Sequence, residues 1–475
     1  MLKHSGIKPE VIKEIIDKKG ARVYMIGIGG VSMSALSREL LRRGAIISGS
    51  DSGSPERCRA LRERGVEISS VHSREHLEGF CPELVVYTLA ASENNEEYRY
   101  ALENGIPAVS RAELLGALVG DYSRSVGISG SHGKSTVTAM LYHILGELGE
   151  SPTVLEGAAL YERRASAEDA KTLVFEACEY GDSFLKMHPS LGVVLNVELD
   201  HTDYFSDIGA ICRSFSAYVC GAEQALVNID DENARRIAEN ARERIFTFGE
   251  RAGADYRFEI TGENLGKYAF RLYYKERPEG VMSLSVPGRF NVSNSVAAIC
   301  AAHLLGVPIS EACAALSSFR GLPRRLERLD IPGAPIYYDY AHHPTEISAV
   351  IAALYEMGYK RVGVIFCPHT YSRTKALMSD FAKALSAAHI VAITDIYAAR
   401  EREIHGVSAE ALALECRKMK VACAALNGEQ AFSFVSRSGC DVIALMGAGE
   451  LGGVISAARK MVDKGFSPCY NRGEK

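Results

Sequence analysis

The feature that most constrains this chain is a glycine-rich turn, Gly-Ser-His-Gly-Lys-Ser, at residues 130–135. An apolar run at 124–129 precedes the turn, and a helical pattern of apolar residues at 137–148 follows it. A turn between a strand and a helix aims backbone N–H groups at one point, where the helix dipole also favours an anion. We therefore expect an α/β unit here, with a phosphate site at the turn.

Two side chains of this turn fit a bound nucleoside triphosphate. Lys134 can reach the β- and γ-phosphate oxygens, and the Ser135 hydroxyl can bind Mg²⁺. The general pattern has a further glycine where this chain has Ile128, so the match is Gly-x-x-Gly-Lys-Ser in the strand–turn–helix context that such a site needs. The alternative is a solvated glycine turn with an exposed lysine.

A second glycine turn, Gly-Ile-Gly-Gly, lies at residues 27–30. The order of apolar run, turn, helical pattern and short strand over residues 21–48 predicts a βαβ unit. Asp51 follows Gly30 by about 20 residues, where an acid can accept a ribose hydroxyl. Ser32 replaces the third glycine of a dinucleotide fingerprint, so the turn predicts a diphosphate with an attached ribose and not NAD specifically. The alternative is a tight turn with a surface aspartate.

The length of 475 residues, at roughly 100–200 residues per domain, means about three domains. Apolar strands alternate with helical patterns near the N-terminus and again after an arginine-rich stretch at 321–330. Between them, residues 256–275 alternate in polarity, which is typical of antiparallel strands. We expect an α/β fold of three consecutive domains: a Rossmann-like domain at 1–120, a P-loop-type ATPase domain with a mixed sheet at 121–321, and a Rossmann-like domain at 322–475.

Composition and charge argue against several other classes of protein. The chain has 54 basic and 59 acidic residues, and its net charge of −5 argues against broad electrostatic binding to nucleic acid or an anionic membrane. No apolar stretch reaches the ~18–20 residues that span a bilayer, and the N-terminus lacks the apolar core of a signal peptide. The 12 cysteines include no C-x-x-C pair, and many lie in apolar runs, such as Cys178, Cys300 and Cys367. Buried reduced thiols in a cytoplasmic protein explain this pattern better than disulfides or zinc.

A carboxylate and an imidazole follow two further strands of the central region. Glu176 ends one apolar strand, and His201 follows another. Residues beyond the carboxyl ends of parallel strands line the ligand crevice, so beside a triphosphate these two are expected to bind Mg²⁺ or Mn²⁺. Glu198 and Asp200 compete for that role, and each of these residues fits a solvated loop equally well. An arginine pair at 324–325, in the linker to the third domain, could also reach phosphate or stay solvated.

Two polar motifs follow apolar strands of the third domain, Asp-Tyr-Ala-His-His-Pro-Thr-Glu and Pro-His-Thr-Tyr-Ser-Arg-Thr. Both open helices, which puts them at crevice positions of a third sheet. His342 and Arg373 could hold a carboxylate, and arginine is the better bidentate partner. The alternative is helix capping by Thr345 and Thr374 beside ordinary surface histidines.

Taken in this order, the motifs resemble the Mur ligase family of ATP-dependent amide ligases. The resemblance rests on Ile-Gly-Ile-Gly-Gly-Val-Ser-Met-Ser, Gly-Ser-His-Gly-Lys-Ser, Glu-Ala-Cys-Glu, Asp-His, Pro-Gly-Arg-Phe-Asn and the two motifs of the third domain. Together they span nearly the whole chain. Within the family the pattern is most similar to members that attach L-alanine to UDP-N-acetylmuramate.

The resemblance implies a role for each group of motif residues. Gly29 and Gly30 would lie at the diphosphate of the UDP-sugar, with Asp51 toward its uridine end. Contacts with ATP are implied for Gly130, Ser131, His132, Gly133, Lys134, Ser135 and Thr136 at the phosphates, for Asn291 and Asn294 at adenine, and for Asp339 elsewhere on the nucleotide. The implied metal ligands are Ser135, Glu176 and His201. The amino-acid end of the site would contain Tyr340, His342 and Arg373, and the implied catalytic set is Lys134, Glu176, His201, Arg325, His342 and Arg373.

Three residues depart from the family pattern. Phe290 stands where many members carry histidine beside adenine, and Thr370 stands where some carry a second arginine. Cys178 replaces an aspartate that often follows the metal-binding glutamate. These departures remove individual polar contacts and leave the motif order intact.

The implied reaction has two steps. The lactyl carboxylate of UDP-N-acetylmuramate attacks the γ-phosphate of ATP, and the amine of L-alanine then displaces phosphate from the acyl phosphate. The expected setting is cytoplasmic peptidoglycan precursor synthesis, which serves cell-wall growth, cell shape and division, in a monomer or weak homodimer. The alternatives are a ligase that attaches a preformed peptide, an NAD-dependent dehydrogenase built on the first glycine turn, and a non-catalytic nucleotide-gated regulator. Alanine, glycine and serine all stay open as the amino acid.

Overall fold

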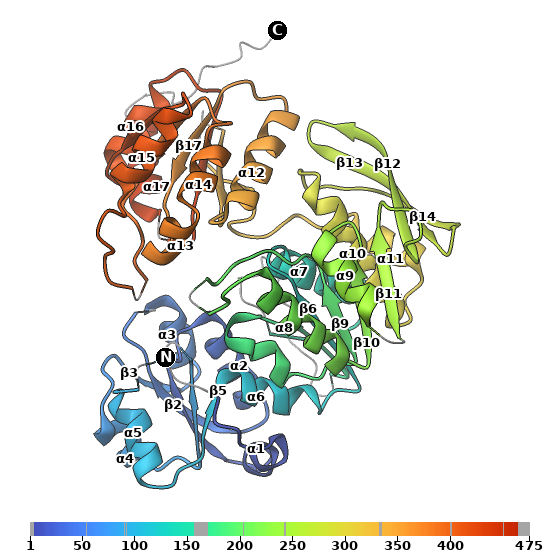
Figure 1. Cartoon of the computed structure of the whole chain (residues 1–475). Helices are drawn as coiled ribbons and strands as arrows, with labels where there is room; N and C mark the ends of the chain where they lie inside the picture. The colour runs from blue at the N-terminus through green and yellow to red at the C-terminus, as the bar shows by residue number, and fades with distance from the viewer. Residues whose placement is uncertain are drawn as a thin grey trace. The chain divides into compact units, whose positions relative to one another are not determined.

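The computed structural model describes residues 4–53, 55–89, 91, 93–155, 170–202, 204–241, 244–331, 335–399, 401–449 and 451–463. The chain divides into two compact units (Figure 1). The first unit comprises Met1–Glu198, Ile208–Tyr256 and Ala297–Ala312. The second comprises Leu199–Asp207, Arg257–Val296 and Cys313–Lys475.

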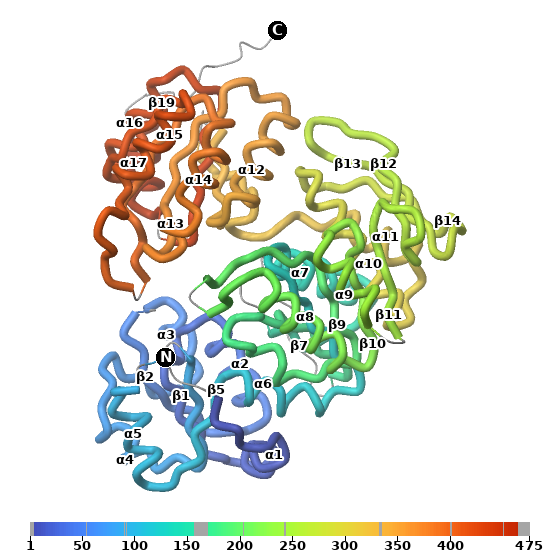
Figure 2. Tube along the Cα trace, in the orientation of Figure 1, coloured from blue at the N-terminus to red at the C-terminus, as the bar shows by residue number. Residues whose placement is uncertain are grey.

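The N-terminal part of the first unit is a parallel five-stranded sheet in the order β3-β2-β1-β4-β5. Its strands are β1 (Arg22–Ile26), β2 (Ile46–Ser50), β3 (Glu67–Ser69), β4 (Leu84–Tyr87) and β5 (Ala108–Ser110). Its helices are α1 (Pro9–Ile16), α2 (Val31–Arg42), α3 (Pro55–Arg62), α4 (Arg74–Phe80), α5 (Glu96–Glu103) and α6 (Arg111–Val119). All of β4 is buried, as expected of a parallel strand covered on both faces. Helices α4 and α5 lie side by side (Figure 2).

The rest of the first unit contains six parallel strands in the order β11-β10-β9-β6-β8-β7. They are β6 (Arg124–Ser129), β7 (Thr153–Leu155), β8 (Thr172–Glu176), β9 (Leu191–Val194), β10 (Gln224–Asn228) and β11 (Ile245–Gly249). The accompanying helices are α7 (Lys134–Glu147), the 3₁₀ helix η1 (Tyr180–Lys186), α8 (Ile208–Gly221) and α9 (Glu232–Asn240). Strand β6 has β8 on one side and β9 on the other, so the glycine turn that follows β6 lies at a switch point of the strand order.

The second unit contains antiparallel strands and a further α/β layer. The antiparallel strands are β12 (Tyr256–Asn264), β13 (Lys267–Tyr274) and β14 (Arg277–Ser283), of which the alternating pattern predicted the first two. The helices that follow, α10 (Phe290–Leu304) and α11 (Ile309–Leu316), have residues in both units. A six-stranded sheet follows in the order β15-β16-β20-β17-β18-β19. Its strands are β15 (Glu327–Arg328), β16 (Ile336–Asp339), β17 (Val362–Phe366), β18 (Ile390–Ile393), β19 (Ala422–Ala425) and β20 (Val442–Met446).

Helices cover both faces of this last sheet (Figure 1). They are α12 (Pro344–Glu356), α13 (Tyr371–Ala376), α14 (Met378–Leu385), α15 (Ala409–Lys418), α16 (Gly428–Ser436) and α17 (Gly452–Asp463). Leu354, Phe381 and Leu412 from α12, α14 and α15 share one buried cluster. Phe432 and Val454 from α16 and α17 belong to a second cluster. The fold is α/β with a Rossmann-like arrangement at each end of the chain, as the sequence predicted.

Some details differ from the sequence-based expectations. The 11 described cysteines are free thiols and most are buried, but Cys178 is partly exposed; Cys469 lies outside the described residues. The helix caps are His343 for α12 and Thr370 for α13, so the capping alternative chose the wrong residues. No helix in the described ranges is long and apolar enough to cross a membrane. The three domain boundaries stay a prediction.

Candidate active site

The turn after β6 has the geometry of an anion site. Gly130 and Gly133 adopt φ values of 141° and 88°, which favour glycine, and α7 begins at Lys134. A Cβ atom on Gly130 would lie 3.0 Å from the Cβ of Leu195, so the turn packs directly on the chain after β9. No described side chain caps α7. The first N–H groups of a helix have no partner inside it, so this end of α7 is open to an anion.

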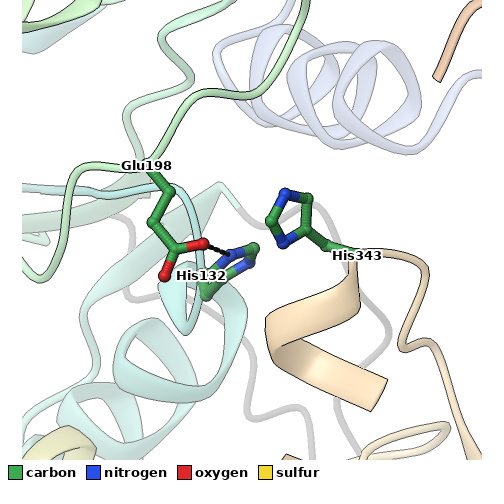
Figure 3. Close-up of side chains that lie close together, drawn as sticks. All are labelled: His132, Glu198 and His343. Atoms are coloured by element: carbon green, nitrogen blue, oxygen red, sulfur yellow. Dashed lines mark hydrogen bonds and ion pairs between the residues drawn. The ribbon is translucent and has the colours of Figure 1, made fainter. Parts of the chain in front are cut away.

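The chain after β9 holds the turn in place. The side chain of Asn196 accepts a hydrogen bond from the His132 N–H (2.8 Å) and donates one to the His132 carbonyl (3.1 Å). The Ser131 hydroxyl accepts from the Glu198 N–H at 2.8 Å, and the His132 ring faces the Glu198 carboxylate at 3.4 Å (Figure 3). The turn is therefore preorganised by a neighbouring strand end. His343, the third side chain drawn in Figure 3, caps α12 in the second unit.

Lys134 forms a buried ion pair at the turn. Its ammonium lies 3.0 and 3.1 Å from the two carboxylate oxygens of Glu179, and it also donates to the carbonyls of Gly130 and Ser131. Burial alone would lower the pKa of Lys134, but the Glu179 carboxylate raises it above the ordinary value. Lys134 is therefore a fixed cation at the open end of α7.

Three other predicted residues lie close to the same turn in the fold. Ser135 and Thr136 lie in the first turn of α7. Glu176 is the last residue of β8, and it pairs in register with Ile128 of β6, one strand over from the turn. A carboxylate and a hydroxyl are oxygen ligands that suit Mg²⁺. His201, the third predicted metal ligand, belongs to the second unit.

The glycine turn after β1 is held by residues from the next strand. Gly27 and Ile28 donate their N–H groups to the Ser50 carbonyl, and Gly29 donates to a carboxylate oxygen of Asp51 at 3.0 Å. Arg57 from α3 donates to the Gly29 carbonyl. Asp51 thus contacts the turn itself, and a guanidinium that the sequence analysis did not select lies beside it.

In the second unit Arg373 holds a carboxylate. Its Nε and Nη2 atoms lie 3.2 and 2.7 Å from one oxygen of Asp200, and the same oxygen accepts from the His201 N–H. Burial would raise the pKa of Asp200, but the His201 and Arg373 cations hold it well below its ordinary value. Burial lowers the pKa of His369 to about 3, and the neighbouring His342 ring and Arg373 guanidinium act in the same direction. His369 is therefore neutral near pH 7, and its Nδ1 can accept from Arg373 at 3.0 Å.

His342 and the linker arginines gather around Tyr340. The His342 ring lies 5.2 Å from the Tyr340 ring, and its Nδ1 lies 3.2 Å from the Glu346 carboxylate. The guanidinium groups of Arg324 and Arg325 lie 4.7 and 5.2 Å from the centre of the Tyr340 ring. Such contacts combine cation–π attraction with stacking. The arginine pair is therefore packed against Tyr340 within the second unit and is not a solvated stretch.

Asp339, at the end of β16, accepts hydrogen bonds from the N–H groups of Leu326 and Ala341, both at 2.7 Å. Burial raises the pKa of Asp339 to about 6, although Arg325 and these two donors oppose the rise. Both carboxylate oxygens are therefore committed to the backbone of the linker and the next loop. The predicted nucleotide contact of Asp339 stays a prediction.

The predicted adenine-side residues lie at the start of α10. Asn291 donates to the Pro287 carbonyl at 2.7 Å, and Asn294 donates to the side-chain oxygen of Asn291 at 3.2 Å. The Phe290 ring lies over Gly288, where a Cβ atom would come within 2.6 Å of it. The two asparagines form one buried hydrogen-bonded pair, and their contact with adenine stays a prediction.

Three residues of these sites were missed from the sequence: Arg57, Glu179 and Asn196. Glu179 and Asn196 follow the carboxyl ends of β8 and β9, so the strand-end rule that selected Glu176 applied to them as well. Arg57 lies in a helix that no motif marks, and no local signal would have found it.

Comparison with known proteins agrees with this geometry. Three family models match: "Mur ligase family, catalytic domain" at residues 22–123, "Mur ligase middle domain" at 128–302, and "Mur ligase, glutamate ligase domain" at 324–449. A relative from Caldicellulosiruptor saccharolyticus named UDP-N-acetylmuramate–L-alanine ligase is 38% identical over 440 residues, which cover 90% of this chain and 96% of the relative. This chain belongs to the Mur ligase family.

Further Mur ligases resemble the chain over most of its length. A UDP-N-acetylmuramate–L-alanine ligase from Caldanaerobacter subterraneus is 40% identical over 406 residues, covering 84% of this chain and 88% of the relative. The crystal structure of UDP-N-acetylmuramate-alanine ligase MurC from Thermotoga maritima superposes with a TM-score of 0.77 at 25% identity and covers 93% of this chain and 98% of that one. A murein peptide ligase from Psychrobacter arcticus, at 21% identity and a TM-score of 0.68, covers 93% of this chain and 99% of its own and shows the shared fold.

Proposed function

We propose that this Mur ligase joins the lactyl carboxylate of UDP-N-acetylmuramate to the amine of L-alanine at the expense of ATP. The observation that carries this proposal is the presence of two strand–glycine turn–helix sites in one chain, of which only the second has a lysine at the start of its helix. The first suits the diphosphate of the UDP-sugar, and the second suits the phosphates of ATP. The relatives named above support the choice of sugar and amino acid.

Activation of the carboxylate is the first chemical step. The carboxylate oxygen attacks the γ-phosphorus, the bond to the β-phosphate oxygen breaks, and ADP leaves with an acyl phosphate formed. Two anions must approach each other, so a fixed cation lowers the barrier. Lys134 supplies it at the open end of α7, and Arg325 is the proposed second cation. Ser135, Glu176 and His201 would hold Mg²⁺, which supplies further charge neutralisation on the phosphates.

Amide formation is the second step. The neutral amine of L-alanine attacks the acyl carbon, a tetrahedral intermediate forms, and inorganic phosphate leaves. His342 is the proposed group that orients the amine or accepts its proton. Arg373 is the proposed partner of the alanine carboxylate. Because it already binds Asp200, that role requires either its remaining N–H groups or exchange of Asp200 for the substrate.

The residues at the nucleotide complete the proposal. The backbone of residues 130–133 and the first turn of α7 would hold the phosphates, and Asn291, Asn294 and Asp339 would contact the adenosine part. Both ATP and the UDP-sugar are cytoplasmic metabolites, so we place the reaction in the cytoplasm. We further propose that the chain works as a monomer or a weak homodimer.

The test is phosphate release from ATP with Mg²⁺ and UDP-N-acetylmuramate, against a panel of single amino acids and short peptides. The products are weighed by mass spectrometry. We expect release to require both the sugar and L-alanine, with a product heavier by one alanyl residue, and glycine and serine to rank below alanine. If phosphate were released only when a preformed peptide replaced the single amino acid, the chain would be a peptide-attaching ligase instead. No release with any acceptor would contradict the proposal.

A further inference from the structure

The ammonium of Lys134 is already bound by the protein where a nucleotide phosphate would meet it. Glu179 binds it with both carboxylate oxygens, at 3.0 and 3.1 Å, and two carbonyls of the turn accept from it as well. The side chain of Glu179 is 1% exposed, whereas that of Lys134 is 16% exposed. The lysine side chain thus keeps a small exposed part, whereas the carboxylate that binds its ammonium is buried.

A phosphate oxygen can reach this ammonium only if an existing acceptor gives way. An ammonium has three N–H donors, and here two carboxylate oxygens and two carbonyls share them. The carboxylate is the only anion among these four acceptors, and it is therefore the strongest competitor for a second anion. It also repels a polyphosphate directly, because little water screens a buried charge.

Glu179 is buried at the start of a closely packed segment. It immediately precedes η1, whose Phe184 is fully buried and stacks on Tyr218 with ring centroids 4.7 Å apart. A Cβ atom on Gly116 of α6 would lie 2.0 Å from the Lys186 carbonyl, so η1 also packs directly on α6. Two neighbouring helices thus hold the segment that Glu179 begins, so we expect the exchange to occur by a small displacement of the ammonium away from the carboxylate.

We propose that Glu179 is a positioning residue that competes with nucleotide phosphate for the Lys134 ammonium, so that binding a triphosphate exchanges one ion pair for another. The inference rests on the proposed function only in assigning the turn after β6 to nucleotide phosphate. Beyond that function, the inference makes Glu179 a residue that sets the affinity of this turn for nucleotide phosphate. Glu179 keeps the ammonium at the turn before the nucleotide arrives, and it weakens ground-state binding of the phosphates.

The test compares phosphate-bearing and phosphate-free ligands. Calorimetry without divalent cations measures the Kd of inorganic tripolyphosphate and of adenosine for the wild type and for Glu179→Gln. We expect Glu179→Gln to bind tripolyphosphate about tenfold more tightly, because a neutral amide competes less for the ammonium and does not repel the anion. The Kd of adenosine should stay unchanged. A folded Glu179→Gln variant that binds tripolyphosphate no more tightly than wild type would overturn the inference.

Two further variants separate competition from a structural role. Glu179→Asp keeps the charge and should restore a tripolyphosphate Kd within about threefold of wild type. Glu150→Gln removes a different carboxylate, paired with Arg124 at 2.6 Å at the other end of β6, and should leave the Kd unchanged. Tightening by Glu150→Gln as large as that by Glu179→Gln would show a general charge effect and overturn the inference.

A measurement on the unmodified chain covers the case in which Glu179→Gln fails to fold. With ¹³C-labelled glutamate and ¹⁵N-labelled lysine, tripolyphosphate should shift the Glu179 carboxylate and Lys134 ammonium resonances together. A Glu179 resonance that stays fixed while tripolyphosphate saturates the site would overturn the exchange. This outcome is independent of ligase activity: release of phosphate with UDP-N-acetylmuramate and L-alanine tests the proposed function, and tripolyphosphate binding tests Glu179.

Discussion

The two glycine turns of the first unit, after β1 and after β6, begin from the same local pattern and acquire different chemistry. Each follows a buried parallel strand and opens a helix. After β6, the cation is Lys134 in the first turn of the following helix, and its counter-charge is Glu179 from the end of a neighbouring strand. After β1, the charged groups at the turn are Asp51 and Arg57, which come from the next strand end and the next helix.

The difference shows how one local motif serves two kinds of ligand. A cation in the first turn of α7 lies within reach of the same N–H groups that would bind a phosphate, so charge and donors are coupled over a few residues. At the turn after β1, the charged side chains come from outside the turn, from the end of the next strand and from the next helix. We therefore infer that the turn after β6 serves phosphate transfer, and that the turn after β1 serves recognition of a larger group.

Loss of the lysine should have the largest effect. We expect Lys134→Ala to lower turnover about a hundredfold or more, because the γ-phosphate loses its nearest fixed cation. The measurement is phosphate release with all three substrates saturating, and Lys171→Ala, which removes an exposed lysine of the same unit, is the control. A Lys134→Ala enzyme that keeps more than about a tenth of wild-type turnover, a barrier change under ~1.4 kcal/mol, would contradict the role.

The next largest effect should come from replacing a single glycine with alanine, and the cost in stability should differ between the two turns. At Gly130 the φ of 141° and a Cβ contact of 3.0 Å with Leu195 both oppose a side chain, whereas at Gly30 the φ is −60° and the nearest atom lies at 3.3 Å. We expect Gly130→Ala to cost about 1–3 kcal/mol and to raise the KM for ATP, and Gly30→Ala to cost less. Thermal melts and KM values for both variants check this, and equal costs would remove the distinction.

Removal of the two Asn196 hydrogen bonds that hold the turn after β6 should have an intermediate effect on stability and on ATP binding. Asn196→Ala removes both hydrogen bonds to His132, and we expect a loss of about 1–3 kcal/mol in unfolding free energy with a higher KM for ATP. Asn196→Asp keeps the acceptor and loses the donor, so its unfolding free energy and its KM for ATP should lie between those of the wild type and of Asn196→Ala. Urea denaturation and ATP kinetics are the measurements. An Asn196→Ala variant with wild-type affinity for ATP would mean that the turn holds its shape unaided.

On the other turn, Asp51→Ala should act on substrate binding. The carboxylate holds the Gly29 N–H, so its removal is expected to raise the KM for UDP-N-acetylmuramate about tenfold, equivalent to ~1.4 kcal/mol, with a smaller change in kcat. The KM for ATP serves as the internal control and should stay the same. A selective fall in kcat would instead place Asp51 in the chemistry.

The smallest effect concerns pH and the support of the turn after β1. His72 lies 2.9 Å from the buried Glu97 carboxylate and contacts the hydroxyl of Ser50, whose carbonyl holds the turn. The Glu97 hydrogen bond raises the pKa of His72 above 6.5, so this pair stabilises the fold fully below pH 6.5 and loses its contribution as pH rises through the folded pKa. We expect His72→Gln to reduce the fall in unfolding free energy as the pH rises above 6.5. An unchanged slope in urea denaturation would argue against the pair.

Most of the fold was predictable because it depends on local patterns. The buried run of β6, the glycine turn and the apolar face of α7 all lie within about 25 residues, and the structure confirms them. The alternation over 256–275 likewise predicted β12 and β13. The site was predictable only where a strand end marked it, as with Glu176. Asn196 and Glu179 also follow strand ends, but their partners lie dozens of residues away along the chain.

The sequence by itself determined that this chain is an α/β protein with two glycine turns between a strand and a helix, because strand, turn and helix are each specified by neighbouring residues. Only the tertiary structure decided how each charge is used. It pairs Lys134 with Glu179 and Arg373 with Asp200. The physical reason is that a buried charge must find a partner, and folding brings that partner from a distant segment that no local pattern identifies.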